Sequence, residues 1–154
     1  MEEKLAQNIT VESMKVEDLD DVLKVEASCF KNSWSRYAFL SELTENKLSR
    51  YIIVKIGEKL VGYAGMWLVF DEAHVTNIGL LPEYRGFGIG ELLMRYLINL
   101  ALKNGAEKMT LEVRKTNYVA QNLYSKLGFE PSGIRKGYYM DDHEDAIIMW
   151  KDLI

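Results

Sequence analysis

Arg85-Gly86-Phe87-Gly88-Ile89-Gly90 is the most informative stretch of this chain. An apolar run ends just before this stretch, and an amphipathic helical pattern begins just after it. Glycine has no Cβ, so backbone N–H groups in such a loop can approach a ligand closely. The start of a helix adds unpaired N–H donors and the positive end of the helix dipole. The stretch therefore predicts a pyrophosphate-binding loop with a cation at its entrance.

Two common nucleotide-binding loops do not fit these glycines. A Walker A loop ends in Gly-Lys-Ser/Thr, whereas Glu91 follows Gly90 here. A Rossmann or kinase loop, Gly-x-Gly-x-x-Gly, needs glycine at the position that Glu91 occupies. What remains is Arg-x-x-Gly-x-Gly at Arg85, Gly88 and Gly90. The alternative is a glycine-rich turn that only joins a strand to a helix.

Apolar periodicity on both sides of the loop predicts seven strands and four helices in the order βααβββαβαββ. The expected strands cover residues 9–14, 51–56, 60–70, 73–81, 108–114, 129–139 and 144–153. The expected helices cover residues 16–27, a segment after Ser35, about 88–103, and a segment from Asn117 to Gly128. Hairpins mixed with β-α-β crossovers predict an α/β fold with one mixed sheet, in a single domain over residues 1–154.

Composition excludes several classes of protein. The chain has 154 residues, 48% of them hydrophobic and 27% charged, with a net charge of −4 and no basic run, so we expect no direct nucleic-acid contact. The apolar run 60–70 is too short to span a bilayer, and Met1-Glu2-Glu3-Lys4 lacks the features of a signal peptide. Cys29 is the single cysteine, and His74 and His143 lack metal-ligand spacing. We therefore expect a cytoplasmic protein without membrane attachment or a metal.

Further motifs follow the glycine loop. They are Leu111-Glu112-Val113-Arg114, Asn117, Asn122-Leu123-Tyr124 and Leu127-Gly128-Phe129, with Pro82-Glu83-Tyr84 just before the loop. In this order they resemble the GNAT family of N-acetyltransferases over essentially the whole chain. The resemblance implies the GNAT acyl-CoA N-acyltransferase fold, with a mostly antiparallel, twisted sheet of about seven strands and about four helices. It also implies acetyl-CoA as the cosubstrate.

Three other segments resemble the branch of that family that acts on protein N-termini: residues 71–78, Tyr138-Tyr139 and residues 144–149. This resemblance implies transfer of an acetyl group to the N-terminal alanine of small-subunit ribosomal protein S-18, by direct attack in a ternary complex. The partner would be the N-terminus of that ribosomal protein. The alternatives are a broader N-terminal, lysine or small-amine acetyltransferase and a non-catalytic acyl-CoA-binding module.

The family fold, as the resemblance implies, parts the strand 73–81 from the strand 108–114. The pantetheine arm would lie in the gap, and Gly79 suits a place where a ligand approaches the backbone. The pyrophosphate would bind the loop amides, and Asn117, unless it is only a helix N-cap, would contact the arm from the other side. The residues expected to bind the cosubstrate are Ile78, Gly79, Leu80, Arg85, Gly86, Phe87, Gly88, Ile89, Gly90 and Asn117.

Strand alternation places Thr110, Glu112 and Arg114 on one face of their strand and apolar residues on the other. Glu112 therefore points to the polar side. The resemblance makes it the base that deprotonates the acceptor amine, directly or through ordered water. The alternative is an ordinary solvated glutamate.

Tyr124 lies on the apolar stripe of its helix, so a purely structural role is the alternative there. By resemblance it would be the acid, or at least the hydrogen-bond donor, for the departing CoA sulfur. Tyr138 and Tyr139 would line the peptide groove, with Trp34 closing it from the other side.

Overall fold

The structure is a computed structural model that describes residues 8–154. The expectation drawn from residues 1–4 lies outside this range. The strands are β1 (Ile9–Ser13), β2 (Ser49–Ile56), β3 (Lys59–Val69), β4 (Glu72–Leu80), β5 (Lys108–Arg114), β6 (Glu130–Arg135) and β7 (Ala146–Asp152). The helices are α2 (Leu19–Cys29), α3 (Arg36–Thr44), α4 (Ile89–Lys103) and α5 (Tyr118–Lys126), with 3₁₀ turns at Val16–Asp18 and Pro82–Tyr84. The predicted order of strands and helices is confirmed.

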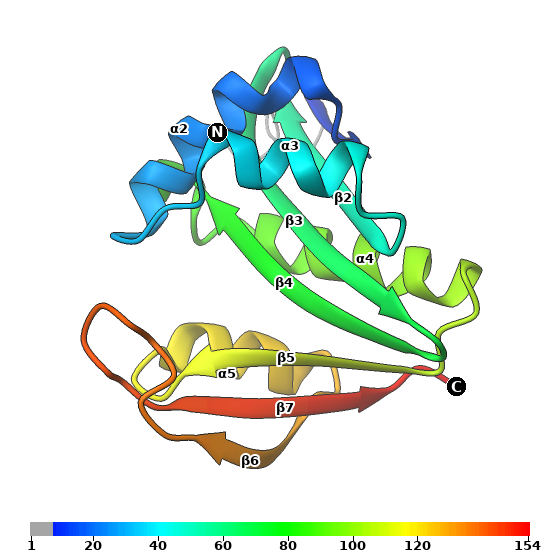
Figure 1. Cartoon of the computed structure of the whole chain (residues 1–154), viewed down its shortest axis with the longest axis vertical. Coiled ribbons are helices and arrows are strands. Elements are labelled where there is room, and N and C mark those ends of the chain that lie inside the picture. Colours follow the sequence, from blue (N-terminus) through cyan, green and yellow to red (C-terminus); the bar gives the residue numbers. More distant parts are fainter. Residues whose placement is uncertain (1–7) are drawn as a thin grey trace.

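All seven strands form one sheet in the order β1-β2-β3-β4-β5-β7-β6. Every neighbouring pair is antiparallel except β4 and β5, which are parallel. Helices α2 and α3 cover one face of the β1–β4 half, and α4 and α5 lie on the opposite face of the sheet (Figure 1). The predicted mixed, mostly antiparallel sheet is confirmed.

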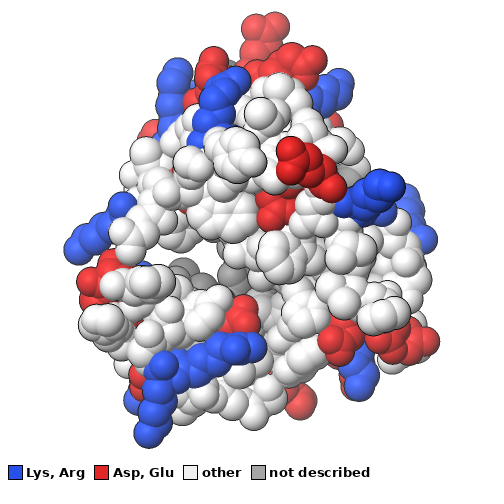
Figure 2. All heavy atoms as spheres, in the orientation of Figure 1, with Lys and Arg blue, Asp and Glu red and all other residues white. Residues whose placement is uncertain are grey.

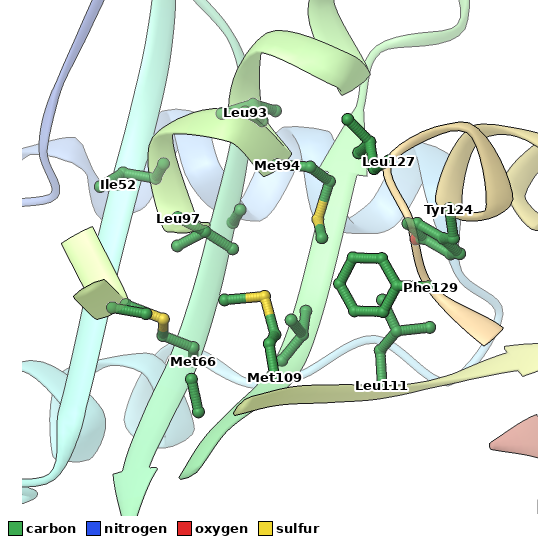
Figure 3. Close-up of a cluster of buried hydrophobic side chains, with 14 of the residues drawn as sticks. Ile52, Met66, Leu93, Met94, Leu97, Met109, Leu111, Tyr124, Leu127 and Phe129 are labelled. Carbon is green, nitrogen blue, oxygen red and sulfur yellow. The ribbon is translucent and has the colours of Figure 1, made fainter. Parts of the chain in front are cut away.

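The larger apolar core lies between the sheet and helices α4 and α5 (Figure 3). It spans both halves of the sheet, the half formed by β1–β4 and the half formed by β5–β7. Leu93, Met94 and Leu97 of α4 are fully buried because the apolar face of this helix recurs at helical spacing. Side chains from both halves complete this core: Ile52, Met66, Met109, Leu111, Tyr124, Leu127, Phe129 and Met149. The two halves are therefore joined by packing on this face.

A smaller core lies on the opposite face, under α2 and α3. Phe39 of α3 is fully buried and contacts the rings of Tyr51 and Tyr63 edge-on, with centroids 6.4 and 5.6 Å away. Ser35 caps α3 by accepting the Ala38 N–H at 3.1 Å, as its sequence position predicted. In the described chain, this second core is confined to the β1–β4 half of the sheet.

Several predicted boundaries were wrong. The strand expected over 129–139 ends at Arg135, because the chain turns at Gly137, where φ is +60°. Tyr138 and Tyr139 therefore lie in a loop, and β7 begins at Ala146 rather than at 144. The helix expected over 16–27 begins as a 3₁₀ turn and becomes α-helical only at Leu19. Among residues 8–154, no helix combines the length and the apolar character needed to span a bilayer.

Candidate active site

The sheet opens between β4 and β5. These parallel strands pair over only three residues each, and the last pair is His74 with Thr110. β4 then continues to Leu80, and β5 to Arg114, without further pairing between them. Just past the last pair, β4 has a β-bulge: Val75 and Asn77 pair with consecutive residues of β3, and Thr76 between them has no partner. A bulge of this kind bends a strand. The predicted parting of the strands is confirmed, and Figure 2 shows the surface hollowed between the two halves.

The glycine loop connects the end of β4 to α4. Gly86 and Gly88 have φ values of +87° and +82°, which L side chains rarely adopt. A Cβ added at either position would meet nothing within 4 Å, so both positions border open space. Within the described chain, the backbone N–H groups of residues 86–90 have no hydrogen-bond acceptor. The loop and the start of α4 therefore present a row of free donors and the positive end of a helix dipole to one open region.

Arg85 is anchored beside this loop. Its Nε donates to the Leu80 carbonyl at 3.2 Å, and its Nη2 lies 3.4 Å from the sulfur of Cys29. The Cys29 thiol donates to the same carbonyl at 3.3 Å. The guanidinium is thus held at the end of β4 by the Leu80 carbonyl and by the last residue of α2.

The β4 residues predicted to face the cosubstrate lie beyond the last β4–β5 pair. Ile78 and Leu80 are half-buried and pack against the larger core. Gly79 is required for an internal reason, because a Cβ there would lie 2.8 Å from the Tyr63 ring. Its lack of a side chain therefore accommodates packing within the sheet, and the ligand approach expected from the sequence stays a prediction.

Glu112 lies on β5 with its side chain on the face away from the larger core. Its neighbours Leu111 and Val113 are buried against the helices, as the predicted alternation requires. The Glu112 side chain is 24% exposed, and its Oε1 lies 3.4 Å from Nε of Arg135. Glu112 therefore lies on the face opposite the larger core, two residues beyond the last β4–β5 pair, and its carboxylate is partly exposed to solvent.

Tyr124 of α5 is almost fully buried and packs edge-on against Phe129, with ring centroids 5.9 Å apart. Its hydroxyl has no hydrogen-bond partner among residues 8–154, and the hydroxyl oxygen keeps a small exposed area. Burial raises the pKa of Tyr124 to about 12. The phenol is therefore fully protonated at neutral pH and has a hydrogen to donate.

Tyr138 and Tyr139 lie in the loop 136–145 and contact each other edge-on at 5.1 Å. Burial, and then the charge of Glu112, raise the pKa of Tyr138. Burial also raises the pKa of Tyr139, whereas the charge of Arg114 lowers it and the charge of Glu112 raises it. The loop thus brings the tyrosine pair within electrostatic reach of Glu112.

Trp34 and Asn117 have clear local roles. Trp34 is half-buried in the α2–α3 loop and packs on Phe39 with ring centroids 5.3 Å apart. This loop and the loop 136–145 lie on opposite sides of the opening in Figure 1. Asn117 caps α5 by accepting the Ala120 N–H at 3.1 Å, so the N-cap role is confirmed. The cap uses the side-chain oxygen of Asn117 and leaves its amide NH₂ as a donor.

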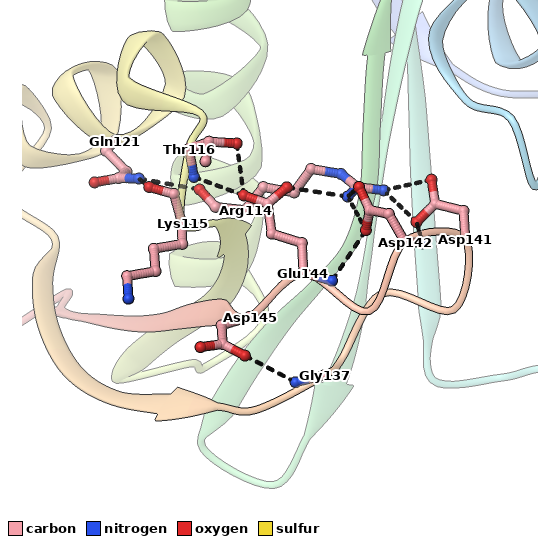
Figure 4. A network of polar contacts seen from close by, with 9 residues as sticks. All are labelled: Arg114, Lys115, Thr116, Gln121, Gly137, Asp141, Asp142, Glu144 and Asp145. Atoms are coloured by element: carbon pink, nitrogen blue, oxygen red, sulfur yellow. Dashed lines mark hydrogen bonds and ion pairs between the residues drawn. The ribbon is translucent and has the colours of Figure 1, made fainter.

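Two polar clusters near the opening were not found from the sequence. Behind β4, the buried carboxylate of Glu26 accepts hydrogen bonds from the Tyr63 hydroxyl and from the backbone N–H of Trp34. Asn77 of β4 donates to the same hydroxyl at 3.3 Å. At the end of β5, Arg114 binds three carboxylates of the loop 136–145 (Figure 4). The only sequence signal for the second cluster was the acidic turn Asp141-Asp142, far downstream of Arg114.

Comparison with known proteins places this geometry in context. The model of the acetyltransferase (GNAT) family matches residues 19–129. A Bacillus subtilis (strain 168) protein, named provisionally as a ribosomal protein bS18-alanine N-acetyltransferase, is 46% identical over 140 residues, which cover 91% of this chain and 93% of that protein. The crystal structure of the Escherichia coli ribosomal-protein-S18-alanine N-acetyltransferase matches with a TM-score of 0.86 and 33% identity over 94% of each chain. A Thermoplasma acidophilum PaiA N-acetyltransferase in complex with coenzyme A has the same fold, with a TM-score of 0.79 and 21% identity over 94% of this chain and 98% of that one.

Proposed function

This chain belongs to the acetyltransferase (GNAT) family, and from that premise we propose that it transfers the acetyl group of acetyl-CoA to a protein N-terminus, as one cytoplasmic domain spanning residues 1–154. The substrate that we propose is the N-terminal alanine of ribosomal protein bS18, on which the named relatives act. The observation that carries the proposal is the parting of β4 and β5 beside a row of free loop amides. Glu112 lies on β5 two residues beyond the last β4–β5 pair, along the same gap.

Acetyl-CoA fits the residues at this site. The pyrophosphate would accept hydrogen bonds from the N–H groups of residues 86–90, next to the charge of Arg85. The pantetheine arm would pair with β4 at residues 78–80, where this strand no longer pairs with β5 and where Arg85 and Cys29 already donate to the Leu80 carbonyl. The Asn117 amide would contact the arm from α5. The thioester supplies an electrophilic carbonyl carbon, and the gap between the strands makes that carbon accessible from the face that carries Glu112.

The acceptor amine must lose a proton before it can attack. An α-amino group has a pKa of about 7.7–8.0 and a lysine side chain about 10.4, so deprotonating lysine at neutral pH costs roughly 3.5 kcal/mol more. An N-terminus is the easier acceptor, although it is still mostly protonated. We assign Glu112 as the base, directly or through a water molecule, because it is a partly exposed carboxylate at the opening.

The transfer then forms the N–C bond and breaks the C–S bond, and the sulfur leaves as a developing thiolate. Tyr124, with a pKa of about 12, is a weaker acid than a thiol with a pKa of about 8.5. Complete proton transfer from Tyr124 would be uphill by about 5 kcal/mol, at 1.36 kcal/mol for each pKa unit. We therefore assign Tyr124 as a hydrogen-bond donor that stabilises the thiolate.

The acceptor peptide would lie on the Glu112 face, between Tyr138 and Tyr139 on one side and the loop of Trp34 on the other. Helices α2 and α3 cover this face only over the β1–β4 half, and β6 is exposed along its whole length. The surface in front of β5 and β7 is therefore available to an extended peptide.

Mass spectrometry tests the proposed function directly. The protein is incubated with acetyl-CoA and a peptide carrying the N-terminus of bS18, and we expect a gain of one acetyl group on the α-amine. The matched control is the same peptide with a blocked N-terminus, which should stay unmodified even when it contains lysine. A panel of peptides with other first residues, lysine peptides and polyamines separates the broader acetyltransferases. Tight acetyl-CoA binding by calorimetry without turnover on any amine would favour a non-catalytic binding module instead.

A further inference from the structure

Arg114 is the last residue of β5, two residues after Glu112 on the same strand face. Its side chain is only 29% exposed and makes its ionic contacts with the loop 136–145 (Figure 4). Nη2 donates to both oxygens of Asp141 at 2.9 and 2.8 Å. Nη1 donates to both oxygens of Asp142, at 3.0 and 3.1 Å, and to Glu144 at 3.2 Å. One guanidinium thus gathers three carboxylates from four consecutive residues.

The same side chain supports the predicted acceptor groove. The Cζ atom of Arg114 lies 4.0 Å from the centroid of the Tyr139 ring, within the range of a cation–π contact. Tyr139 in turn packs edge-on against Tyr138. A continuous set of contacts therefore runs from the end of β5 through Arg114 to the tyrosine pair.

Backbone contacts complete the fold of this loop but do not replace the arginine. The Tyr139 N–H donates to the Glu144 carbonyl at 3.2 Å, and the His143 N–H donates to the Tyr139 carbonyl at 2.8 Å. His143 has a φ of +58°, a conformation that costs a non-glycine residue energy and persists only where its surroundings enforce it. Thr116 and two backbone N–H groups of the loop also donate to these carboxylates, but without Arg114 no cation in the described chain would balance three neighbouring negative charges beside this strained residue.

We propose that Arg114 is a positioning residue for the acceptor: by gathering Asp141, Asp142 and Glu144 and stacking on Tyr139, it holds the tyrosine pair as one wall of the peptide groove beside Glu112. The proposal rests on the proposed function, because it concerns the same reaction. Glu112 itself is held by the ladder between β5 and β7, where it pairs with Ile148, and this ladder does not need the arginine side chain. Loss of Arg114 should therefore weaken acceptor binding more than it slows the chemical step.

The test compares Arg114→Gln and Arg114→Lys with Arg95→Gln, which removes a surface arginine paired with Glu91 on α4. Steady-state kinetics give kcat and KM for the acceptor peptide, and calorimetry gives the Kd for acetyl-CoA. Hydrogen exchange of residues 136–145 reports the order of the loop independently of activity.

For Arg114→Gln we expect the KM for the peptide to rise about tenfold or more, kcat to fall less than threefold, and the Kd for acetyl-CoA to stay unchanged. Exchange in the loop should rise in parallel. Lysine keeps the charge but cannot form the two-pronged contacts, so Arg114→Lys should recover only part of the loss. It also serves as the test variant if the glutamine variant does not fold. Arg95→Gln should resemble the unaltered protein in every measurement.

An unchanged peptide KM in a variant whose loop exchange has risen would overturn the groove assignment. An unchanged exchange rate would overturn the role of Arg114 in holding the loop. A fall in kcat alone, with unchanged KM, would show that Arg114 acts on the chemical step instead. If the unaltered protein acetylates no amine at all, the proposed function fails first and the acceptor role falls with it, while the exchange data still decide what Arg114 does to the loop.

Discussion

The two halves of the sheet, β1–β4 and β5–β7, are stabilised in different ways. In the first half, β2, β3 and β4 are long, pair along nearly their whole length and have apolar cores on both faces. In the second half, β6 is exposed throughout, and the loop beyond it is shaped by ionic contacts around Arg114. In the described chain the halves meet at three β4–β5 residue pairs, in an edge-on contact between His74 and Trp150, and in the core beneath α4 and α5. The comparison indicates that apolar packing on both faces holds the first half, whereas the second half has an apolar core on one face and a loop held by ionic contacts.

The largest effect should come from breaking the core that joins the halves. Leu97 of α4 is fully buried in that core, so Leu97→Ala should lower the free energy of unfolding by about 2–5 kcal/mol. Urea denaturation should still show a single transition, because both halves share the core. The exposed Leu102 of the same helix is the control, and Leu102→Ala should change stability by less than about 0.5 kcal/mol. Two separate transitions would mean that the halves unfold independently.

The next effect concerns the base at the opening. Glu112→Gln should lower kcat by about 10²-fold at neutral pH, because general-base assistance is lost while the side-chain shape is kept. The deficit should shrink as the pH passes the amine pKa of about 7.7–8.0, because the amine then deprotonates without help. Glu130→Gln, on the exposed strand β6, is the matched control and should be neutral. A variant as active as the unaltered protein at every pH would remove Glu112 from this role.

A third effect tests whether water reaches the Tyr124 phenol in the larger apolar core. The tyrosine pKa is 10.0 when exposed, as in the unfolded chain, and burial raises it to about 12 in the folded protein. Above pH 10 the unfolded chain loses this proton while the folded protein keeps it, so the stabilisation is complete below pH 10 and is lost as the pH rises through 12. The unaltered protein should therefore lose about 2 kcal/mol between pH 10 and pH 12 that Tyr124→Phe does not lose.

Denaturant titrations at a series of alkaline pH values measure this difference. Tyr118→Phe is the control, since Tyr118 is 67% exposed on the same helix, and it should leave the alkaline loss of stability intact. Equal alkaline losses in the Tyr124→Phe variant and the unaltered protein would mean that water reaches the phenol.

The smallest effect separates backbone strain from ligand binding. Gly88 in the loop and Gly105 after α4 both have positive φ and open space at the Cβ position. Alanine at either position should cost about 1 kcal/mol in stability, because L residues disfavour this conformation. Only Gly88→Ala should also raise the Kd for acetyl-CoA, by about tenfold, because its Cβ would occupy the open space in front of the free loop amides, where the pyrophosphate would bind. Calorimetry measures both affinities, and equal Kd values for the two variants would place the pyrophosphate elsewhere.

Much of the fold was predictable because its signals are local. The alternation that turns Glu112 away from Leu111 and Val113 depends only on strand geometry, and the structure follows it. The glycine loop was recognisable because its conformation depends on residues that adjoin one another in the chain. Ser35 and Asn117 were recognisable as caps for the same reason.

The prediction of a strand over 129–139 was wrong at its end. Tyr138 and Tyr139 suit a strand, but the turn at Gly137 removes them from the ladder. The contact between Gly79 and the ring of Tyr63 was not predicted, because that ring lies on the neighbouring strand and leaves no signal in the local pattern.

The sequence by itself determined the order of the elements, the glycine loop before α4 and the face on which Glu112 lies, because each depends on neighbouring residues and a fixed backbone period. Only the tertiary structure decided where β4 and β5 part, since that depends on a bulge in β4 and on the limited pairing of two distant strands. It alone also brought Arg114 to carboxylates about 30 positions away, because that contact forms only when β7 pairs with β5 and returns the loop to the end of the strand.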